Sequence, residues 1–254
     1  MRSALLLLAL LASGSVVVGC VNNDASLSIE QMEAVTEATA CVATATIGVE
    51  IARGLFDVAA SNHIQGYIGF PLVRNNEVSR MLSSGDPELD SIQLLGANVS
   101  LSFASAADEA KVPVADRKFF WASAGGRLDP AALAPMPIEV VPNNIVTELA
   151  VAPGAFVSVT AKIQPVGMQT SDRIVGGPIY FPVDLCNGCL TNVISACPLP
   201  AGTVVVDTCY PGQDVLATCC QASASQLLCG SLAPIQTTTM STLPPDAHEE
   251  VSHP

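Results

Sequence analysis

FVSVTAKIQ, residues 156–164, alternates strictly between apolar and polar side chains. In an extended chain, successive side chains point to opposite faces. This stretch therefore predicts a β-strand with one face buried against a core. The buried face would carry Val157, Val159, Ala161 and Ile163, and the exposed face Ser158, Thr160, Lys162 and Gln164.

The segments around this strand show the same pattern. Residues 98–103 alternate, and so do residues 179–185, where Pro182 marks an edge strand or the end of pairing. Residues 145–151 also alternate, and the turn at 152–154 that follows predicts a hairpin with residues 156–164. Further candidate strands are residues 47–56, 66–73, 91–95, 138–141 and 203–206.

About eight short strands separated by Gly, Pro and Asn are typical of an all-β protein. We expect an antiparallel, immunoglobulin-like β-sandwich over residues 41–185. Residues 106–137 interrupt the strand rhythm, and such an insertion can carry a binding surface. We expect its three adjacent aromatic residues, Phe119, Phe120 and Trp121, to close the end of the sandwich instead.

The N-terminus has the layout of a secretory signal. Arg2 precedes the apolar run of residues 4–12, small residues follow, and Val17-Val18-Gly19-Cys20 is similar to the lipobox of bacterial lipoproteins. We expect cleavage of residues 1–19 and membrane anchoring by lipid on Cys20, because several acyl chains give stable binding. Two alternatives stay open, a retained membrane span and an ordinary signal that leaves Cys20 for a disulfide.

Residues 20–40 should form a tether followed by a short helix. Ser28 and Gln31 have the spacing of a capping box, and apolar residues follow at helical spacing. Lipoproteins of the inner membrane often carry Asp directly after the lipidated cysteine, and this chain has Val21. By this analogy we expect the protein to be anchored in the outer membrane. Whether it lies on the periplasmic or the surface side stays open.

Charge and histidine content exclude several classes of function. Without Arg2, the chain has nine basic and 23 acidic residues. This excess of negative charge opposes binding to nucleic acid. Outside the tail the only histidine is His63, so no histidine-based triad can be assembled and we expect no catalytic residues and no cofactor. Asp86, Glu88 and Asp90 could suggest calcium, but an acidic turn is the stronger interpretation, and we expect no metal site.

The cysteines predict a disulfide framework. Setting Cys20 aside leaves an even set, as full pairing in an oxidising compartment requires: Cys41, Cys186, Cys189, Cys197, Cys209, Cys219, Cys220 and Cys229. At least one bridge should reach back to Cys41, and the adjacent Cys219 and Cys220 should bond to different partners, because a bridge between neighbours is strained. We expect a cysteine-rich extension over residues 186–230 packed on the sandwich, and a disordered acidic tail over residues 231–254.

The pair Cys186 and Cys189 also supports an alternative function. A CxxC motif can exchange thiols or bind metal. No second CxxC follows at zinc-ribbon spacing, and no βαβ unit surrounds the motif. A structural disulfide is therefore the stronger interpretation, and an envelope redox or metal protein is the alternative.

Several segments carry a family resemblance. They are residues 53–58, 71–76 and 210–214, and above all residues 181–190, FPVDLCNGCL. These segments resemble uncharacterised cysteine-rich lipoproteins of myxobacterial type. The resemblance implies an exported, strand-rich, disulfide-linked protein and implies no activity. We therefore expect a non-enzymatic, lipid-anchored structural or interaction module at the outer membrane.

Overall fold

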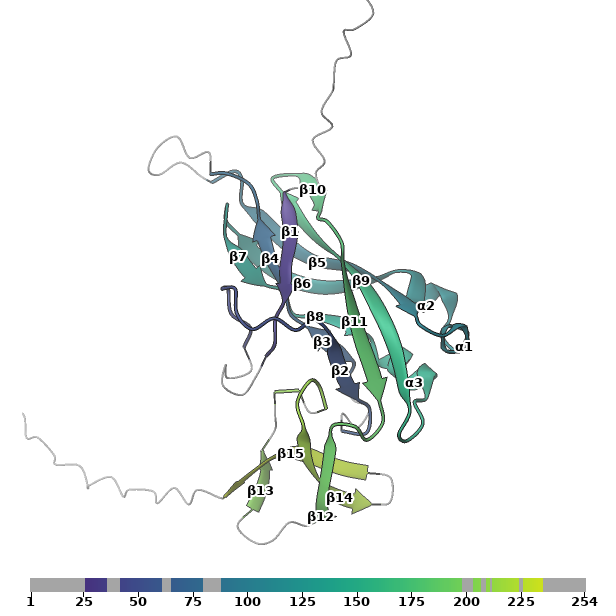
Figure 1. Cartoon of the computed structure of the whole chain (residues 1–254). Helices are drawn as coiled ribbons and strands as arrows, with labels where there is room; N and C mark the ends of the chain where they lie inside the picture. Colours follow the sequence, from purple (N-terminus) through teal and green to yellow (C-terminus); the bar gives the residue numbers. More distant parts are fainter. Residues whose placement is uncertain are drawn as a thin grey trace, which may run out of the picture.

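The computed structural model describes residues 26–35, 42–60, 65–79, 88–197, 203–206, 209–210, 212–223 and 226–234. Strands dominate these residues and the helices are few and short, which confirms the all-β class (Figure 1). The immunoglobulin-like arrangement is not confirmed, because the largest sheet curls into a half-barrel. No helix within the described ranges is long and apolar enough to cross a membrane.

The largest sheet has the strand order β2-β11-β9-β5-β6, and β10 pairs with β9. All its pairs are antiparallel except β2 with β11, which is parallel. Its strands are β2 (Gly54–Asp57), β5 (Ile92–Phe103), β6 (Phe120–Leu128), β9 (Phe156–Gln169), β10 (Asp172–Val175) and β11 (Ile179–Cys186).

The central strand β9 is where the alternating pattern predicted it. Val159, Ala161 and Ile163 are fully buried, whereas the polar residues between them are partly or fully exposed. Its neighbour β5 joins two segments predicted separately, and a bulge at Gly96 connects them. Gly96 has a φ of 145°, and a Cβ there would lie 2.2 Å from the Ala122 carbonyl oxygen, so the bend requires glycine.

Shorter elements cover the inner side of this sheet (Figure 1). One group is the sheet β1-β4-β7, the second is the pair β3-β8, and the helix α3 packs its apolar residues at one end. Together they enclose one main hydrophobic core built mostly from Val, Ile, Leu and Ala. The elements are β1 (Leu27–Met32), β3 (Tyr67–Gly69), β4 (Pro71–Asn75), β7 (Leu133–Pro135), β8 (Ile138–Val141) and α3 (Asn143–Leu149).

The short helix expected within residues 20–40 is wrong for the residues that the structure describes. Residues 27–32 form the strand β1, which pairs antiparallel with β4. Leu27 and Ile29 are buried as a strand requires, and a register shift after Ile29 turns Met32 inward as well. The bulge lets Ile29 and Met32, which are three residues apart as on a helical face, both point into the core from a strand.

The hairpin strand expected at residues 145–151 is also wrong, because this segment is the helix α3. Ile145, Val146 and Leu149 are its buried residues, at a spacing that places all three on one helical face. Pro142 precedes the helix, and Ala150 ends it in the left-handed conformation with a φ of 46°. The alternation in this segment was incidental, since the intervening Val146 is buried too.

The remaining strand predictions fare better. Residues 66–73 correspond to two strands, β3 and β4, and residues 138–141 and 203–206 are strands as expected. Of residues 47–56, only the last three belong to a strand. The strand β9 pairs with β11 along its whole length, whereas β2 pairs with β11 only from Val183 onward. Pro182 therefore marks the end of the pairing with β2, as predicted.

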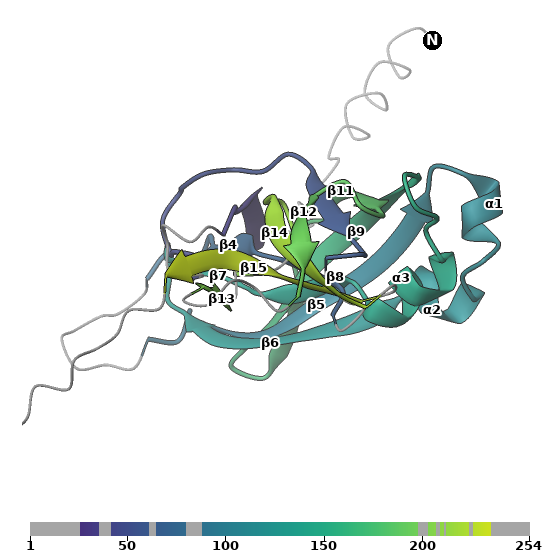
Figure 2. The same cartoon turned by 90° about the horizontal axis from the view of Figure 1, so that it is seen from below.

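The predicted insertion is only partly irregular. It contains α1 (Ala106–Glu109) and α2 (Val114–Lys118), but it also supplies β6 and β7 to the sheets. In Figure 2 the helices α1, α2 and α3 gather at the same end of the molecule.

The cysteine-rich region forms its own small sheet, of order β12-β14-β15-β13, at the opposite end of the molecule from β10 (Figure 1). It has a small separate core of Ala60, Ala217, Cys219 and Cys229. The prediction of a disordered tail over residues 231–254 is wrong for residues 231–234, which belong to β15, and the rest of that segment lies outside the described ranges. The strands are β12 (Thr191–Ala196), β13 (Thr203–Val206), β14 (Ala217–Ser223) and β15 (Gln226–Pro234).

Candidate functional site

The solvent side of the largest sheet carries four large aromatic side chains. Phe119, Trp121, Phe156 and Tyr180 are between 41% and 67% exposed. This corrects the expectation that the aromatic triplet closes an end of the fold. Only the middle residue, Phe120, packs against the core, because the strand alternation turns its two neighbours outward.

The strand register places polar residues between these rings. Asn98 on β5 lies opposite Trp121 on β6 and opposite Gln164 on β9. One step along the strands, Ser100 lies opposite Lys162, which in turn lies opposite Tyr180 on β11. We call this surface the outer face and define it by Trp121, Asn98, Ser100, Lys162, Gln164 and Tyr180.

The width of the outer face follows from the strand order. Trp121 and Tyr180 stand on β6 and β11, which are separated by three strand-to-strand steps. With strands about 4.8 Å apart, the two aromatic sides lie about 14 Å from each other across a polar strip. Aromatic rings thus border the strip on both sides, and neutral amide and hydroxyl groups occupy most of it.

Two charged side chains near the outer face are neutralised locally. Asp184 forms an ion pair with Arg53 and accepts a hydrogen bond from Ser158. Arg127 pairs with Asp129 at 2.9 Å. Lys162 has no ion pair with any residue that the structure describes, so the outer face presents one uncompensated positive charge in a chain of net charge −13.

A second cluster lies beneath the CxxC motif. The buried Asp57, at the end of β2, accepts hydrogen bonds from three backbone N–H groups: Ala59 at 2.9 Å, Gly188 at 2.8 Å and Leu190 at 2.7 Å. Its two carboxylate oxygens therefore hold the loop that Cys186 and Cys189 close by a disulfide. The loop is fixed to the main sheet by a charged acceptor.

The ligand atoms of Asp57, Cys186 and Cys189 lie within 4.8 Å of one another, which is close enough for a metal ion. Two features oppose redox or metal chemistry at this cluster. The Asp57 oxygens are already used by backbone donors. A thiolate at the fully buried Cys186 would also stand beside a carboxylate, and like charges at this distance disfavour each other.

A loop after β13 fixes the cysteine-rich region to β2 and β3. Gln213 makes two hydrogen bonds to the backbone of Ile68, at 2.6 Å and 2.9 Å. The Asp214 carboxylate accepts from the Leu55 N–H at 2.7 Å and from the Tyr67 hydroxyl at 2.8 Å. The loop that precedes β14 is therefore bound to the main fold by these polar contacts.

Burial changes the acidity of both partners in this contact. Loss of hydration raises the pKa of Asp214, although its hydrogen bonds to Leu55 and Tyr67 act in the opposite direction. Burial also raises the pKa of Tyr67, and the adjacent Asp214 raises it further. Tyr67 is fully buried and stays a neutral donor.

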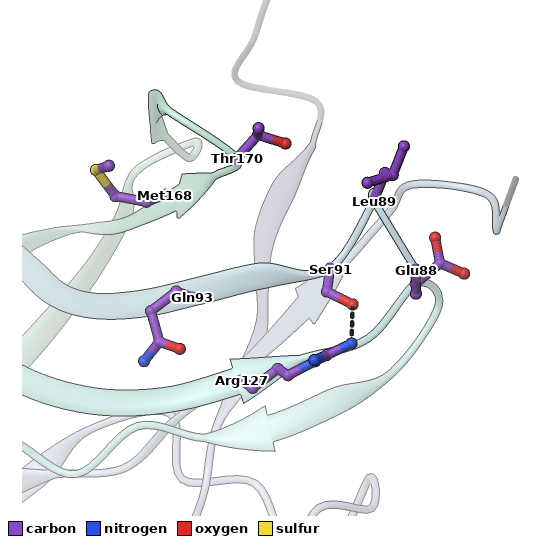
Figure 3. A pocket seen from close by; sticks show the side chains of 7 residues that line it. All are labelled: Glu88, Leu89, Ser91, Gln93, Arg127, Met168 and Thr170. Carbon is purple, nitrogen blue, oxygen red and sulfur yellow. Dashed lines mark hydrogen bonds between the residues drawn. The ribbon is translucent and has the colours of Figure 1, made fainter. Parts of the chain in front are cut away.

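A cavity of about 330 Å³ lies where β9 turns into β10 (Figure 3). Arg127 points across it, and its Nη2 donates to the Ser91 hydroxyl at 2.9 Å. Arg127 also pairs with Asp129, and Met168 and Leu89 make part of the lining apolar.

The structure brings most of the predicted cysteines together. Cys186 bonds to Cys189, Cys197 to Cys220 and Cys219 to Cys229, so the adjacent pair has two different partners as predicted. Cys209 is disulfide-bonded as well. The predictions for Cys20, Cys41, His63 and Asp86 concern residues outside the described ranges.

Two acidic residues of the expected turn are described. Glu88 accepts a hydrogen bond from the Asp90 backbone N–H at 3.0 Å, as in a local turn. Asp90 is buried and accepts from the Gln169 side chain at 3.1 Å. Asp90 therefore supports the fold through β9.

The sequence interpretation missed the outer face and the Asp57 cluster. The signal for the first was present, because Lys162 and Gln164 were assigned to the polar side of their strand and Tyr180 alternates with the buried Phe181. Only the strand order shows that Trp121 belongs to the same surface. No family model matches the chain, and comparisons with curated proteins and with solved structures find no match.

Proposed function

We propose that this protein is a non-enzymatic binding module of the cell envelope, anchored to the outer membrane by lipid on Cys20. It engages its partner through the outer face. One observation carries the proposal: exposed aromatic rings stand on both sides of a polar strip on the same sheet. Exposed aromatic residues are enriched where proteins bind, because they offer large contact areas at low entropic cost.

The anchor rests on the signal-like N-terminus, on Cys20 and on the resemblance to myxobacterial-type lipoproteins. Because β1 begins at Leu27, only residues 21–26 separate Cys20 from the sheet. Six residues span at most about 20 Å. The proposed tether is shorter than residues 20–40, and the folded part is held close to the membrane surface.

The alternative, a thiol-redox or metal protein using Cys186 and Cys189, has weaker support. The Asp57 cluster is arranged as a clamp for the loop, as described above. Titration of free thiols in protein isolated without reductant discriminates between the two functions. We expect no free thiols and no bound metal. Free thiols from an incompletely formed disulfide, or a bound metal ion, would favour the alternative.

Photo-crosslinking in cells tests the binding function. Benzoylphenylalanine at Tyr180 replaces one exposed aromatic side chain by another, so the fold should tolerate it. We expect crosslinked products that are absent when the same group replaces Leu228, which is 43% exposed on β15. Identical products from both positions, or none from Tyr180, would contradict the proposal.

Membrane fractionation tests the anchor independently. The Cys20→Ala protein should leave the membrane fraction, and the wild type should incorporate labelled fatty acid. Membrane association of Cys20→Ala without fatty acid uptake by the wild type would show that the anchor assignment is wrong.

A further inference from the structure

The geometry points to a polysaccharide with sparse carboxylate groups as the ligand of the outer face. This inference rests on the proposed binding function and names its ligand class. Its elements are the two aromatic sides, the polar strip between them and the single uncompensated charge of Lys162.

The aromatic residues favour a ligand with flat, partly apolar faces. Trp121 and Tyr180 are 41% and 67% exposed and stand on opposite sides of the strip. An aromatic ring can pack against the C–H face of a pyranose ring, which buries apolar area while the sugar hydroxyls stay free to bond elsewhere. A sugar chain lying on the strip can therefore contact rings on both sides.

The polar strip favours a ligand rich in hydroxyl groups. Gln164 and Ser100 offer amide and hydroxyl groups that both donate and accept hydrogen bonds, whereas the Oδ1 of the neighbouring Asn98 is buried. Covering these groups costs free energy unless each finds a partner. Sugar hydroxyls are donors and acceptors at once, so they can satisfy the strip without exact matching of donor to acceptor.

A protein partner fits this surface less well. The apolar residues do not form one continuous patch, because polar residues of β5 and β9, among them Ser100 and Lys162, lie between Trp121 and Tyr180. Lysine is depleted at protein interfaces, and the centres of such interfaces are desolvated and apolar. The outer face has its polar groups and its lysine in the middle.

Charge limits how acidic the ligand can be. Lys162 can pair with a carboxylate, since no described residue neutralises it. The chain as a whole has a net charge of −13 and repels a polymer with a charge on every unit. This argument excludes single-stranded nucleic acid, which would otherwise be attracted to exposed aromatic rings.

Native affinity electrophoresis of the full-length protein in mild detergent tests the inference. The gels contain carboxymethylcellulose of low substitution, partly esterified pectin, hyaluronate or xanthan, each beside a neutral polymer such as hydroxyethylcellulose or fully esterified pectin. We expect at least one carboxylated polymer to retard the wild type more than its neutral counterpart does, and single-stranded DNA to have no effect.

Matched variants connect the binding to the outer face. Trp121→Ala and Tyr180→Ala should each weaken binding about tenfold, since each removes one stacked ring. Lys162→Met should abolish the preference for the carboxylated polymer. The controls Leu228→Ala and Lys111→Met change an exposed apolar residue and a lysine away from the outer face, and both should bind like the wild type.

The outcomes separate this inference from the proposed function. Retardation by no polysaccharide in the panel, equal binding of Trp121→Ala and wild type, or stronger binding of DNA would each overturn the glycan assignment. Capture of one protein by crosslinking from Tyr180 would also overturn it while supporting the binding module. If no polysaccharide retards the protein and crosslinking from Tyr180 also gives no specific product, the proposed function is wrong as well.

Discussion

At the scale of single residues, Asp57 does the most for the attachment of the CxxC loop. Its carboxylate accepts three backbone hydrogen bonds, and an amide can accept on only one of its two terminal atoms. Asp57→Asn should therefore lower the free energy of unfolding by about 2 kcal/mol. Denaturant unfolding of oxidised protein measures this, and Asp172→Asn, an exposed acid at the start of β10, is the comparison. An equal loss in both variants would show that the backbone contacts are unimportant.

The second residue prediction concerns pH. The pKa of Asp214 is raised in the folded protein, so the folded state holds a proton that the unfolded state has released. The contribution of Asp214 to stability is present below its ordinary pKa of 3.8 and is lost as the pH rises through the higher folded value. The unfolding free energy of the wild type should thus fall relative to Asp214→Asn as the pH rises above 3.8.

Asp129 provides a control of opposite sign. Hydrogen bonds from Ser91 and Arg127 lower its pKa, so its contribution is lost as the pH falls. If Asp214→Asn and Asp129→Asn shift the pH dependence in the same direction, the assignment for Asp214 is wrong.

At the scale of elements, α3 closes one end of the main core. Leu149→Ala should destabilise the protein by about 3 kcal/mol, because Leu149 is fully buried and its removal leaves a cavity. Glu148→Ala, at the exposed neighbouring position, should stay within about 0.5 kcal/mol of the wild type. Thermal or denaturant unfolding measures both. Similar losses would mean that α3 does not pack as described.

Elements differ in how far the sequence predicts them. The strand β9 alternates over residues 156–164 and β11 over residues 179–185, so the buried faces of these stretches follow from local pattern alone. In α3, the spacing of the apolar residues fits both a strand and a helix. Val146, which lies between them in the sequence, is buried too, and its burial favours the helix. In β1, a bulge imitates helical spacing. Both errors arise where tertiary packing overrides an ambiguous local pattern.

At the scale of the whole molecule, the strand order could not be read from the sequence. Parallel pairing of β2 with β11 joins residues far apart in the chain, and the outer face exists only because β6 and β11 share a sheet with two strands between them. Cysteine pairing is equally hidden, since spacing does not determine connectivity. Alternating segments, in contrast, were enough to predict the all-β class.

The small second core predicts how the molecule responds to loss of a disulfide. Cys219 and Cys229 join β14 to β15 and also supply part of that core. Replacing both by Ser should increase hydrogen exchange at β14 and β15 strongly and leave β9 protected, because the described residues of this sheet form only a small core besides these two cysteines. Exchange measured by mass spectrometry, with wild type as reference, checks this. Equal deprotection of β9 would show that the two parts unfold as one unit.

The contact between Gly188 and Asp57 also bears on chemical ageing. Asn187-Gly188 is a sequence that deamidates readily when the glycine nitrogen attacks the asparagine side chain. Here the Gly188 N–H is held by Asp57, and the Asn187 amide donates to the Val151 carbonyl at 2.8 Å. Both reacting groups are kept in place away from the cyclic intermediate. The native fold therefore preserves the chemical identity of Asn187, and each excursion to an open state exposes this site to irreversible conversion.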